Sequence, residues 1–318
     1  MEKQLALDSS TRLTNMLATA LGQRAGDLLL DENVIEIMLN PDGKLWIDRL
    51  GQGRSYTGVQ ITPSDAERVI FIIASSIGAV CNKDTPLLSA ELPMNGSRFQ
   101  GILPPLSKNP SFSIRKKAIQ IFTLSDYVEK KILSNAHSAA IEEAVKKRSN
   151  ILIVGGTGSG KTTLANAILA LIAETGDRIV IIEDTQELQC SAKDSLALRT
   201  KDEIANMTDL LKATMRLRPD RIVVGEVRGK EALALLKAWN TGHPGGCATV
   251  HADSAAKGLV RLEQLVQEAG LLDSKPIIAE AVDLIIYIVK VGTSRKVQEV
   301  VALRGLQNGA YQLSEVQR

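Results

Sequence analysis

The fold class is decided by the segment ILIVGGTGSGKT, residues 151–162. Its last eight residues fit the pattern G-x-x-x-x-G-K-[ST] of a phosphate-binding loop. The glycines let the backbone curl so that its N–H groups point at phosphate oxygens, and the helix that follows adds its positive N-terminal end. Because the loop leaves an apolar strand and opens a helix, the sequence predicts a nucleotide site.

The expected ligands of this loop are ATP and Mg²⁺. The Lys161 ammonium can reach the terminal phosphates, and the Thr162 hydroxyl can ligate a Mg²⁺ ion that bridges the last two phosphates. The residues expected to contact the nucleotide are Gly155, Gly156, Thr157, Gly158, Ser159, Gly160, Lys161, Thr162 and Thr163.

Beyond the loop, apolar strand-like runs alternate with helical stretches. The predicted strands are Ile151–Val154, Ile179–Glu183, Ile222–Glu226, Ala248–His251 and Leu284–Val289. The predicted helices are Thr162–Glu174, Thr208–Leu217, Lys230–Trp239 and Lys257–Glu268. This alternation indicates an α/β domain with a mostly parallel sheet and helices on both faces. Such sheets bind their ligands at the carboxyl ends of the strands.

The stretch RIVVGE, residues 221–226, ends a buried-type strand in an acid. Many phosphate-loop enzymes place an Asp there to help hold Mg²⁺, but here Gly225 takes that place. Glu226 is therefore better placed as the general base that orients the attacking water. The alternative is that Glu226 only caps the next helix.

Another acid, Glu183, ends the strand at 179–183 and is followed by Asp184. Because neighbouring side chains of a strand point to opposite faces, only one of the two should face the nucleotide. We assign Glu183 as the magnesium-side carboxylate that Gly225 lacks. A structural salt bridge is the alternative.

Two of the three histidines lie in TGHPGGCATVHA, residues 241–252. His251 ends a predicted strand, so it should lie at the active edge of the sheet, where it could hydrogen-bond the γ-phosphate. His243 lies in a glycine-rich turn and either lines a subunit boundary or has a structural role.

Residues before the loop have a different pattern. A helix is expected over 10–30, a hairpin around the turn Asn40–Gly43, and a helix from a Ser64 cap to about Ile77. Short strands are expected at Ser97–Ile102 and Ser111–Arg115. We therefore predict an α+β domain with an antiparallel sheet over 1–125, a linking helical segment over 126–149, and the ATPase domain over 150–318.

Five arginines could stabilise the charge that phosphoryl transfer spreads over the γ-phosphate oxygens. They are Arg98, Arg115, Arg216, Arg218 and Arg228. Most surface arginines have no such role, so we expect it of two of the five.

Composition excludes several classes of protein. The 38 Lys and Arg nearly balance the 36 Asp and Glu, which argues against a basic stripe for duplex DNA, and no dedicated nucleic-acid site is evident. No C-x-x-C pair occurs among the three cysteines. No signal-peptide core and no run of about 18 apolar residues is present. We expect a cytoplasmic protein whose membrane contacts are peripheral.

Four of these segments together resemble the traffic ATPases of bacterial secretion systems. GGTGSGKTT, from residue 155, resembles the family's Walker A loop, and IEDTQEL, from 182, resembles its Asp box. RPDRIVVGEVRG, from 218, is similar to its Walker B segment, where the family also has Gly-Glu. TGHPGGCATVHA resembles its His box.

The resemblance implies a hexameric ring with a PAS-like N-terminal domain and a RecA-like, P-loop C-terminal domain. It implies that nucleotide binds between the two domains, and that Arg98 and Arg115 reach its phosphates. The four-cysteine zinc insertion of many type II and pilus relatives is absent, which favours the type IV secretion and conjugation branch. Partners would then be other secretion proteins at the inner membrane.

The resulting functional hypothesis is ATP hydrolysis that drives pilus assembly or substrate export. A nucleic-acid motor of the RecA type is the alternative, although aromatic residues make up only 3% of the chain, which leaves few platforms for stacked bases. A third hypothesis is a scaffold that binds nucleotide without hydrolysing it.

Overall fold

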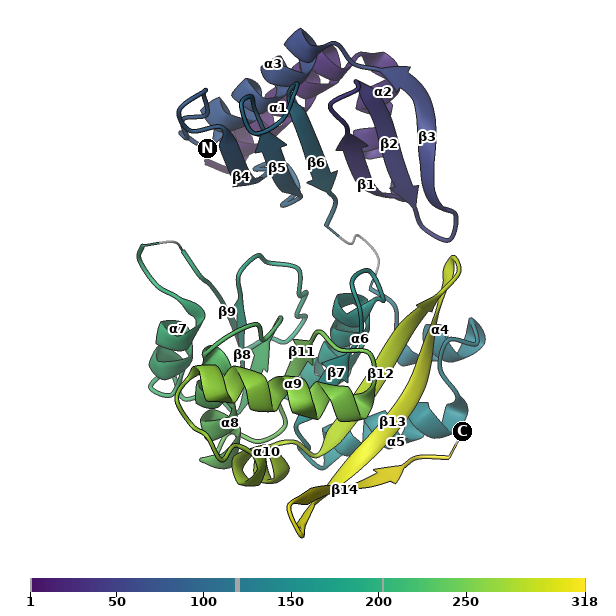
Figure 1. The fold of residues 1–318 in the computed structure, drawn as a ribbon, viewed down its shortest axis with the longest axis vertical. Helices are drawn as coiled ribbons and strands as arrows, with labels where there is room; N and C mark the ends of the chain where they lie inside the picture. The colour runs from purple at the N-terminus through teal and green to yellow at the C-terminus, as the bar shows by residue number, and fades with distance from the viewer. Residues whose placement is uncertain (1, 118–120, 202, 318) are drawn as a thin grey trace. The chain divides into compact units, whose positions relative to one another are not determined.

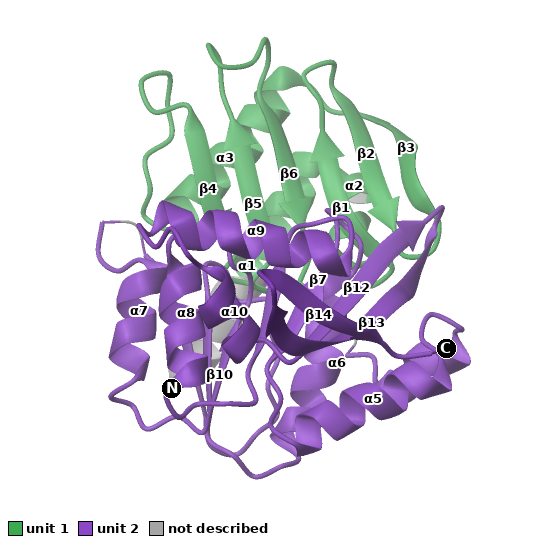
Figure 2. Ribbon diagram, turned by 60° about the horizontal axis from the view of Figure 1, so that its bottom comes forward, with its two compact units in different colours: residues 1–119 green, residues 120–318 purple. Residues whose placement is uncertain are grey.

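The computed structural model describes residues 2–117, 121–201 and 203–317. The chain splits into two compact units, Met1–Ile119 and Gln120–Arg318, which Figure 2 shows in different colours. Each unit contains its own β-sheet.

The first unit contains a six-stranded sheet in the order β3-β2-β1-β6-β5-β4, with all neighbouring strands antiparallel. The strands are β1 (Val34–Leu39), β2 (Lys44–Arg49), β3 (Gly53–Gln60), β4 (Leu87–Glu91), β5 (Arg98–Ile102) and β6 (Ser111–Arg115). The predicted hairpin turn joins β1 to β2, and Gly43 takes a φ of 80° there. A left-handed backbone conformation of this kind is unfavourable for residues other than glycine.

Helices α1 (Glu2–Leu21), α2 (Gln23–Leu30) and α3 (Pro63–Ser76) cover one face of this sheet (Figure 1). Leu17 of α1 and Ile70 of α3 pack in one core with Ile37 of β1. The opposite face carries Met38 and Trp46 as well as the polar Ser113, as the pairing of these residues and strand alternation show.

Two expectations for this unit need correction, and two strands were missed. The single helix expected over 10–30 is two helices, because Gly22 has a φ of 78° between them. Thr62, not Ser64, caps α3: its hydroxyl accepts the N–H of Asp65 at 3.2 Å. Strands β3 and β4 were not predicted, and β3 lacks the apolar alternation that would have indicated it.

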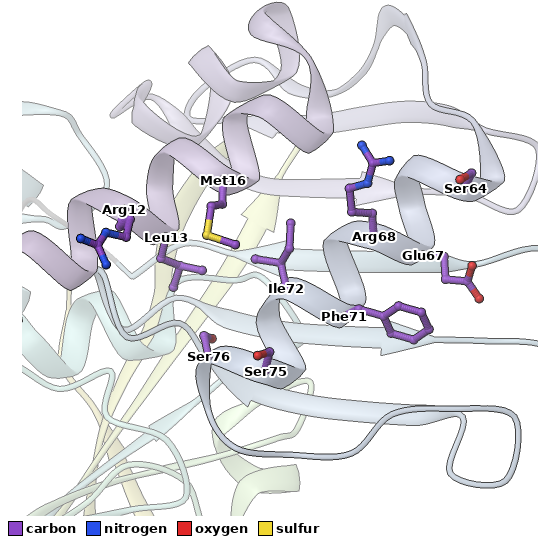
Figure 3. Close-up of a pocket in the computed structure, with 10 residues that line it drawn as sticks. All are labelled: Arg12, Leu13, Met16, Ser64, Glu67, Arg68, Phe71, Ile72, Ser75 and Ser76. Carbon is purple, nitrogen blue, oxygen red and sulfur yellow. The ribbon is translucent and has the colours of Figure 1, made fainter.

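A cavity of about 610 Å³ lies between α1 and α3 in this unit. Figure 3 shows Leu13, Met16 and Ile72 lining it from the two helices, with Arg68 above them. None of the expected site residues lines this cavity.

The second unit contains an eight-stranded sheet in the order β14-β13-β12-β7-β11-β10-β8-β9. The six strands from β12 to β9 are parallel, while β13 and β14 form an antiparallel edge. The strands are β7 (Ile151–Val154), β8 (Ile179–Glu183), β9 (Ser195–Arg199), β10 (Arg221–Val224), β11 (Cys247–Val250), β12 (Leu284–Val291), β13 (Ser294–Gln307) and β14 (Ala310–Glu315).

Helices cover both faces of this sheet, as predicted (Figure 1). One face packs on α4 (Leu124–Glu129), α5 (Asn135–Lys146) and α6 (Lys161–Ala173). The other packs on α7 (Met207–Thr214), α8 (Glu231–Asn240), α9 (Ala255–Glu268) and α10 (Lys275–Ala281). Alternate residues of β7 pack into the two cores. Ile151 and Ile153 pack into one core, and Leu152 and Val154 pack into the other. This explains why the buried strands read as continuous apolar runs.

The parallel arrangement brings the carboxyl ends of β7, β11, β10 and β8 to one edge of the sheet. The phosphate-loop motif, His251, Glu226 and Glu183 lie at or directly after these ends. Strand β10 ends at Val224 and β11 at Val250, so Glu226 and His251 lie in the loops that follow. Among the described residues, no helix is both long and apolar enough to cross a membrane.

Candidate active site

The loop from Gly155 to Gly160 connects β7 to α6 in a shape that only glycines allow. Gly158 and Gly160 have φ angles of 68° and 96°. A Cβ on Gly155 would collide with the carbonyl oxygen of Ile288 and the hydroxyl of Ser159. Gly158 and Gly160 are therefore required by backbone conformation, and Gly155 by close packing against β12.

Lys161 begins α6 and folds back over this loop. Its side chain is nearly buried, and Nζ donates to the carbonyl oxygens of Gly155 at 2.8 Å and Gly156 at 3.0 Å. The hydroxyl of Ser159 is also buried and has no hydrogen-bond partner within the described part of the chain. Thr162 and Thr163 follow in the first turn of α6 and are half-buried.

His251 joins the loop to the neighbouring strands. Its Nε2 lies 3.2 Å from the Thr157 hydroxyl, and its Nδ1 lies 3.4 Å from Lys161 Nζ. An ammonium can only donate, so Nδ1 accepts and Nε2 carries the proton in a neutral ring. The same Nδ1 lies 3.6 Å from Glu226 Oε1. His251 therefore lies between the loop lysine and the candidate base.

Glu226 forms an ion pair with Arg228. Its Oε2 accepts from Arg228 Nε at 2.9 Å and also from Nη2. Burial raises the pKa of Glu226, but the hydrogen bond and charge of Arg228, with the charge of Lys161 nearby, outweigh burial and lower it. The carboxylate is therefore held in its charged form.

The alternative that Glu226 caps the next helix is not what the geometry shows. Helix α8 starts at Glu231, whose own Oε1 accepts the backbone N–H groups of Arg228 at 2.6 Å and Gly229 at 2.8 Å. The acid that satisfies these N–H groups is therefore Glu231.

Glu183 ends β8 and is nearly buried. Its Oε1 accepts the backbone N–H groups of Glu187 at 3.0 Å and Leu188 at 2.9 Å. It therefore holds the turn that follows β8, whatever else it does. Its neighbour Asp184 accepts from the Thr200 hydroxyl at 2.9 Å and lies 3.6 Å from Arg228 Nη1.

His243 lies at the opposite, amino-terminal side of β10, where its Nδ1 contacts the carbonyl oxygen of Pro219 at 2.9 Å. The turn that carries His243 thus precedes β11, whereas His251 follows it. The structure does not bring the two histidines together.

Arg98 and Arg115 belong to the first unit and are direct neighbours there, paired across β5 and β6. Each also faces an acid on its other side, Glu91 opposite Arg98 and Glu36 opposite Arg115. Residues paired directly across antiparallel strands point to the same face of the sheet. The two arginines therefore share one face with two carboxylates.

Sequence reasoning missed one residue beside the phosphate loop. Arg295 follows the turn between β12 and β13, and its Cγ lies 3.6 Å from where a Cβ on Gly160 would be. The only local signal is the turn GTSR at 292–295, and β13 was not predicted at all. No sequence pattern linked this turn to the loop 135 residues earlier.

Known proteins are similar to this chain in sequence and in fold. A conjugal transfer protein TrbB from Rhizobium radiobacter is 50% identical over 308 residues, covering 96% of this chain and 95% of that protein. A probable TrbB from Sinorhizobium fredii is 48% identical over 98% of this chain and 96% of its own length. The solved Legionella pneumophila ATPase DotB matches the fold with a TM-score of 0.63 at 20% identity, over 86% of this chain and 79% of that chain.

The family model described as "Type II/IV secretion system protein" matches residues 88–310. That range contains the phosphate loop, both candidate carboxylates, His251, and the two arginines of the first unit. With half of its residues identical to a relative that it matches almost end to end, this chain belongs to the type II/IV secretion system protein family.

Proposed function

We propose that this protein hydrolyses ATP to power type IV secretion of the conjugative kind. The observation that carries the proposal is the convergence of Lys161, His251 and Glu226 on one phosphate loop. A lysine for the phosphates and a charged carboxylate that can orient water are parts that phosphoryl transfer to water needs, and His251 lies between them. The relatives named as conjugal transfer proteins support the choice of process.

The hydrogen-bond donors of the loop are suited to the phosphates of ATP. Lys161 donates hydrogen bonds to two loop carbonyls. A phosphate oxygen is a stronger acceptor and could take the place of these carbonyls. The unpartnered hydroxyl of buried Ser159 offers a further donor inside the loop. Nucleotide contacts are assigned to Gly155–Thr162 and to Thr163 at the start of α6.

Thr162 and Glu183 would hold Mg²⁺, since both present oxygen atoms of the kind this ion prefers. Glu183 lies beside Gly225, the position where other phosphate-loop enzymes carry an Asp. Bound Mg²⁺ would supply positive charge to the β- and γ-phosphates.

Two side chains are assigned to the chemical step. Glu226 orients the attacking water and accepts its proton, with Arg228 keeping the carboxylate charged beforehand. His251 contacts the γ-phosphate through Nε2, exchanging the Thr157 hydroxyl for a phosphate oxygen. Arg98 and Arg115 are assigned to the phosphates as well, from the first unit.

The finer description of the machine is part of the same proposal. The second unit is assigned as a RecA-like domain and the first as a PAS-like domain, in a ring that is hexameric. The ring would work in the cytoplasm, against secretion proteins at the inner membrane. Light scattering with and without ATP would measure its size, and a monomer under both conditions would contradict the ring.

Three substitutions in the full-length protein test the proposed site. K161A should lose ATP binding and turnover. E226Q should keep ATP binding and lose turnover by about two to four orders of magnitude, because an amide cannot take the proton. H251A should lose turnover or the preference for ATP over ADP.

The control is K257A, since the Lys257 side chain is exposed on α9 and pairs with Asp253 at 3.8 Å. Normal hydrolysis by folded K161A protein would overturn the site. Hydrolysis that requires added DNA would instead favour a nucleic-acid motor.

A further inference from the structure

Arg295 is a charged residue beside the phosphate loop to which the proposed chemistry gives no role. Its aliphatic stem passes Gly160 at the N-terminus of α6, next to Ile288 of β12. The residue is half-buried, and its guanidinium donates to the carbonyl of Thr293 in its own turn at 3.1 Å. Within the described residues it forms no ion pair, so the guanidinium has no fixed anionic partner.

The strand that carries Arg295 is tied to the segment after α4, since the Val297 N–H donates to Ile132 O at 2.8 Å. Burial raises the pKa of the Tyr127 phenol, and the positive charge of Arg295 opposes that rise. Tyr127 and Ile288 also belong to the same hydrophobic core. Arg295 therefore lies beside the start of α6, and its positive charge acts on the almost fully buried Tyr127.

Strand order shows which end of a nucleotide would meet Arg295. The groups assigned to the γ-phosphate and water, His251 and Glu226, follow β11 and β10 on one side of β7. Arg295 comes from the hairpin β12–β13 on the other side of β7. From a γ-phosphate at His251, the opposite direction across the loop leads toward β12 and Arg295.

We infer that Arg295 binds the nucleoside half of ATP, with its guanidinium plane stacked on the base. This inference rests on the proposed nucleotide site. A guanidinium is flat, always charged and weakly hydrated, so it stacks on aromatic faces in a way that a lysine cannot. The contact serves ATP and ADP equally, because both carry the same nucleoside.

The test compares R295A with the unchanged full-length protein in binding assays with ATP, ADP and inorganic tripolyphosphate. R295A should lower the affinity for ATP and the affinity for ADP by the same factor, about 3- to 30-fold. Tripolyphosphate, which has no nucleoside, should bind R295A as well as it binds the unchanged protein. R295K keeps the charge and loses the plane, so it should weaken ATP and ADP as well.

The matched control is K296A, which removes the next positive charge on the opposite side of β13 and should change none of the three affinities. Equal losses for ATP and tripolyphosphate in R295A would show a phosphate contact and overturn the nucleoside assignment. Full ATP affinity in R295K or R295A would overturn it too. K161A, measured in the same assay, must lose tripolyphosphate binding. If K161A still binds tripolyphosphate, the proposed phosphate site itself is wrong.

Discussion

Glu183 fills the space beside Gly225. A Cβ on Gly225 would lie 2.9 Å from Glu183 Cγ and 3.1 Å from its Oε1. Neighbouring strands β8 and β10 are parallel here, and the Gly225 N–H donates to Ile182 O at 3.0 Å. Gly225 follows β10 at the place where other phosphate-loop enzymes carry an Asp. The carboxylate that lies against this glycine is that of Glu183, at the end of β8.

We expect G225A to displace Glu183 and loosen the turn that it holds. Loss of the hydrogen bonds to the N–H groups of Glu187 and Leu188, with overpacking, should cost about 1–3 kcal/mol of unfolding free energy. ATP turnover should fall by about one to two orders of magnitude. Urea denaturation and a steady-state ATPase assay measure the two effects.

The control for G225A is the double mutant with E183A. When Glu183 is already truncated, the added methyl group has room, so the second substitution should cost much less than it does alone. Additive costs would mean that the contact between Gly225 and Glu183 has no energetic weight.

Arg228 should set the acid limit of the reaction. Because the folded pKa of Glu226 is lowered from 4.5, its ion pair contributes stability above that pH and loses it as pH falls through the lower folded value. R228A removes the largest lowering cause, so the pKa of Glu226 should rise. The acid limb of the pH–rate profile should then move to higher pH, while K257A should leave it in place. An unmoved limb in R228A would show that Arg228 does not tune this carboxylate.

Much of the second unit could be predicted because its signals are local. Buried parallel strands read as apolar runs, and β7 and β8 were placed with the correct bounds. The positions of His251 and Glu226 at one edge follow from that parallel order alone. Their mutual distances do not, because loops beyond the strand ends set them.

What could not be predicted depends on contacts between distant segments. β13 and β14 pair at the edge of the sheet, and their half-exposed residues carry a weak pattern. The nearness of Arg295 to Gly160 arises only once β12 lies beside β7. Likewise, the pairing of Arg98 with Arg115 depends on register, which no spacing in the sequence reveals.

A buried ion pair at the amino-terminal side of β10 should dominate the stability of the second unit. Arg221 is 1% exposed, and its Nε donates to Asp177 Oδ2 at 2.6 Å. Its other nitrogens donate to the carbonyls of Gly245 and Val145, both at 3.1 Å. D177N leaves this guanidinium without its counter-charge and should cost about 3–5 kcal/mol in urea denaturation.

The comparison for D177N is K147A, which breaks an exposed pair with Glu143 and should cost less than about 1 kcal/mol. Because Asp177 lies away from the carboxyl ends of the strands, folded D177N should still bind ATP. Similar costs for the two substitutions would mean that the buried pair has no special weight.

The last prediction concerns the face of the first sheet that carries Arg98 and Arg115. Two like charges directly opposite each other are unfavourable, and an anion between them would relieve the repulsion. Glu91 and Glu36 offer partial relief from the flanks, although Glu36 Oε1 already accepts from the Ser113 hydroxyl at 2.7 Å.

If these arginines contact the phosphates, as we propose, R98A and R115A should lower the affinity for ATP more than the affinity for ADP. The γ-phosphate adds negative charge, and each lost charge-assisted contact should cost about 1–3 kcal/mol. A ligand shifts a conformation only through its different affinity for two states, so this difference would let hydrolysis release the first unit. Arg54 pairs with Asp48 at the other end of the same sheet, which makes R54A the matched control. Equal losses of affinity for ATP and ADP, or none, would mean that these arginines do not sense the γ-phosphate.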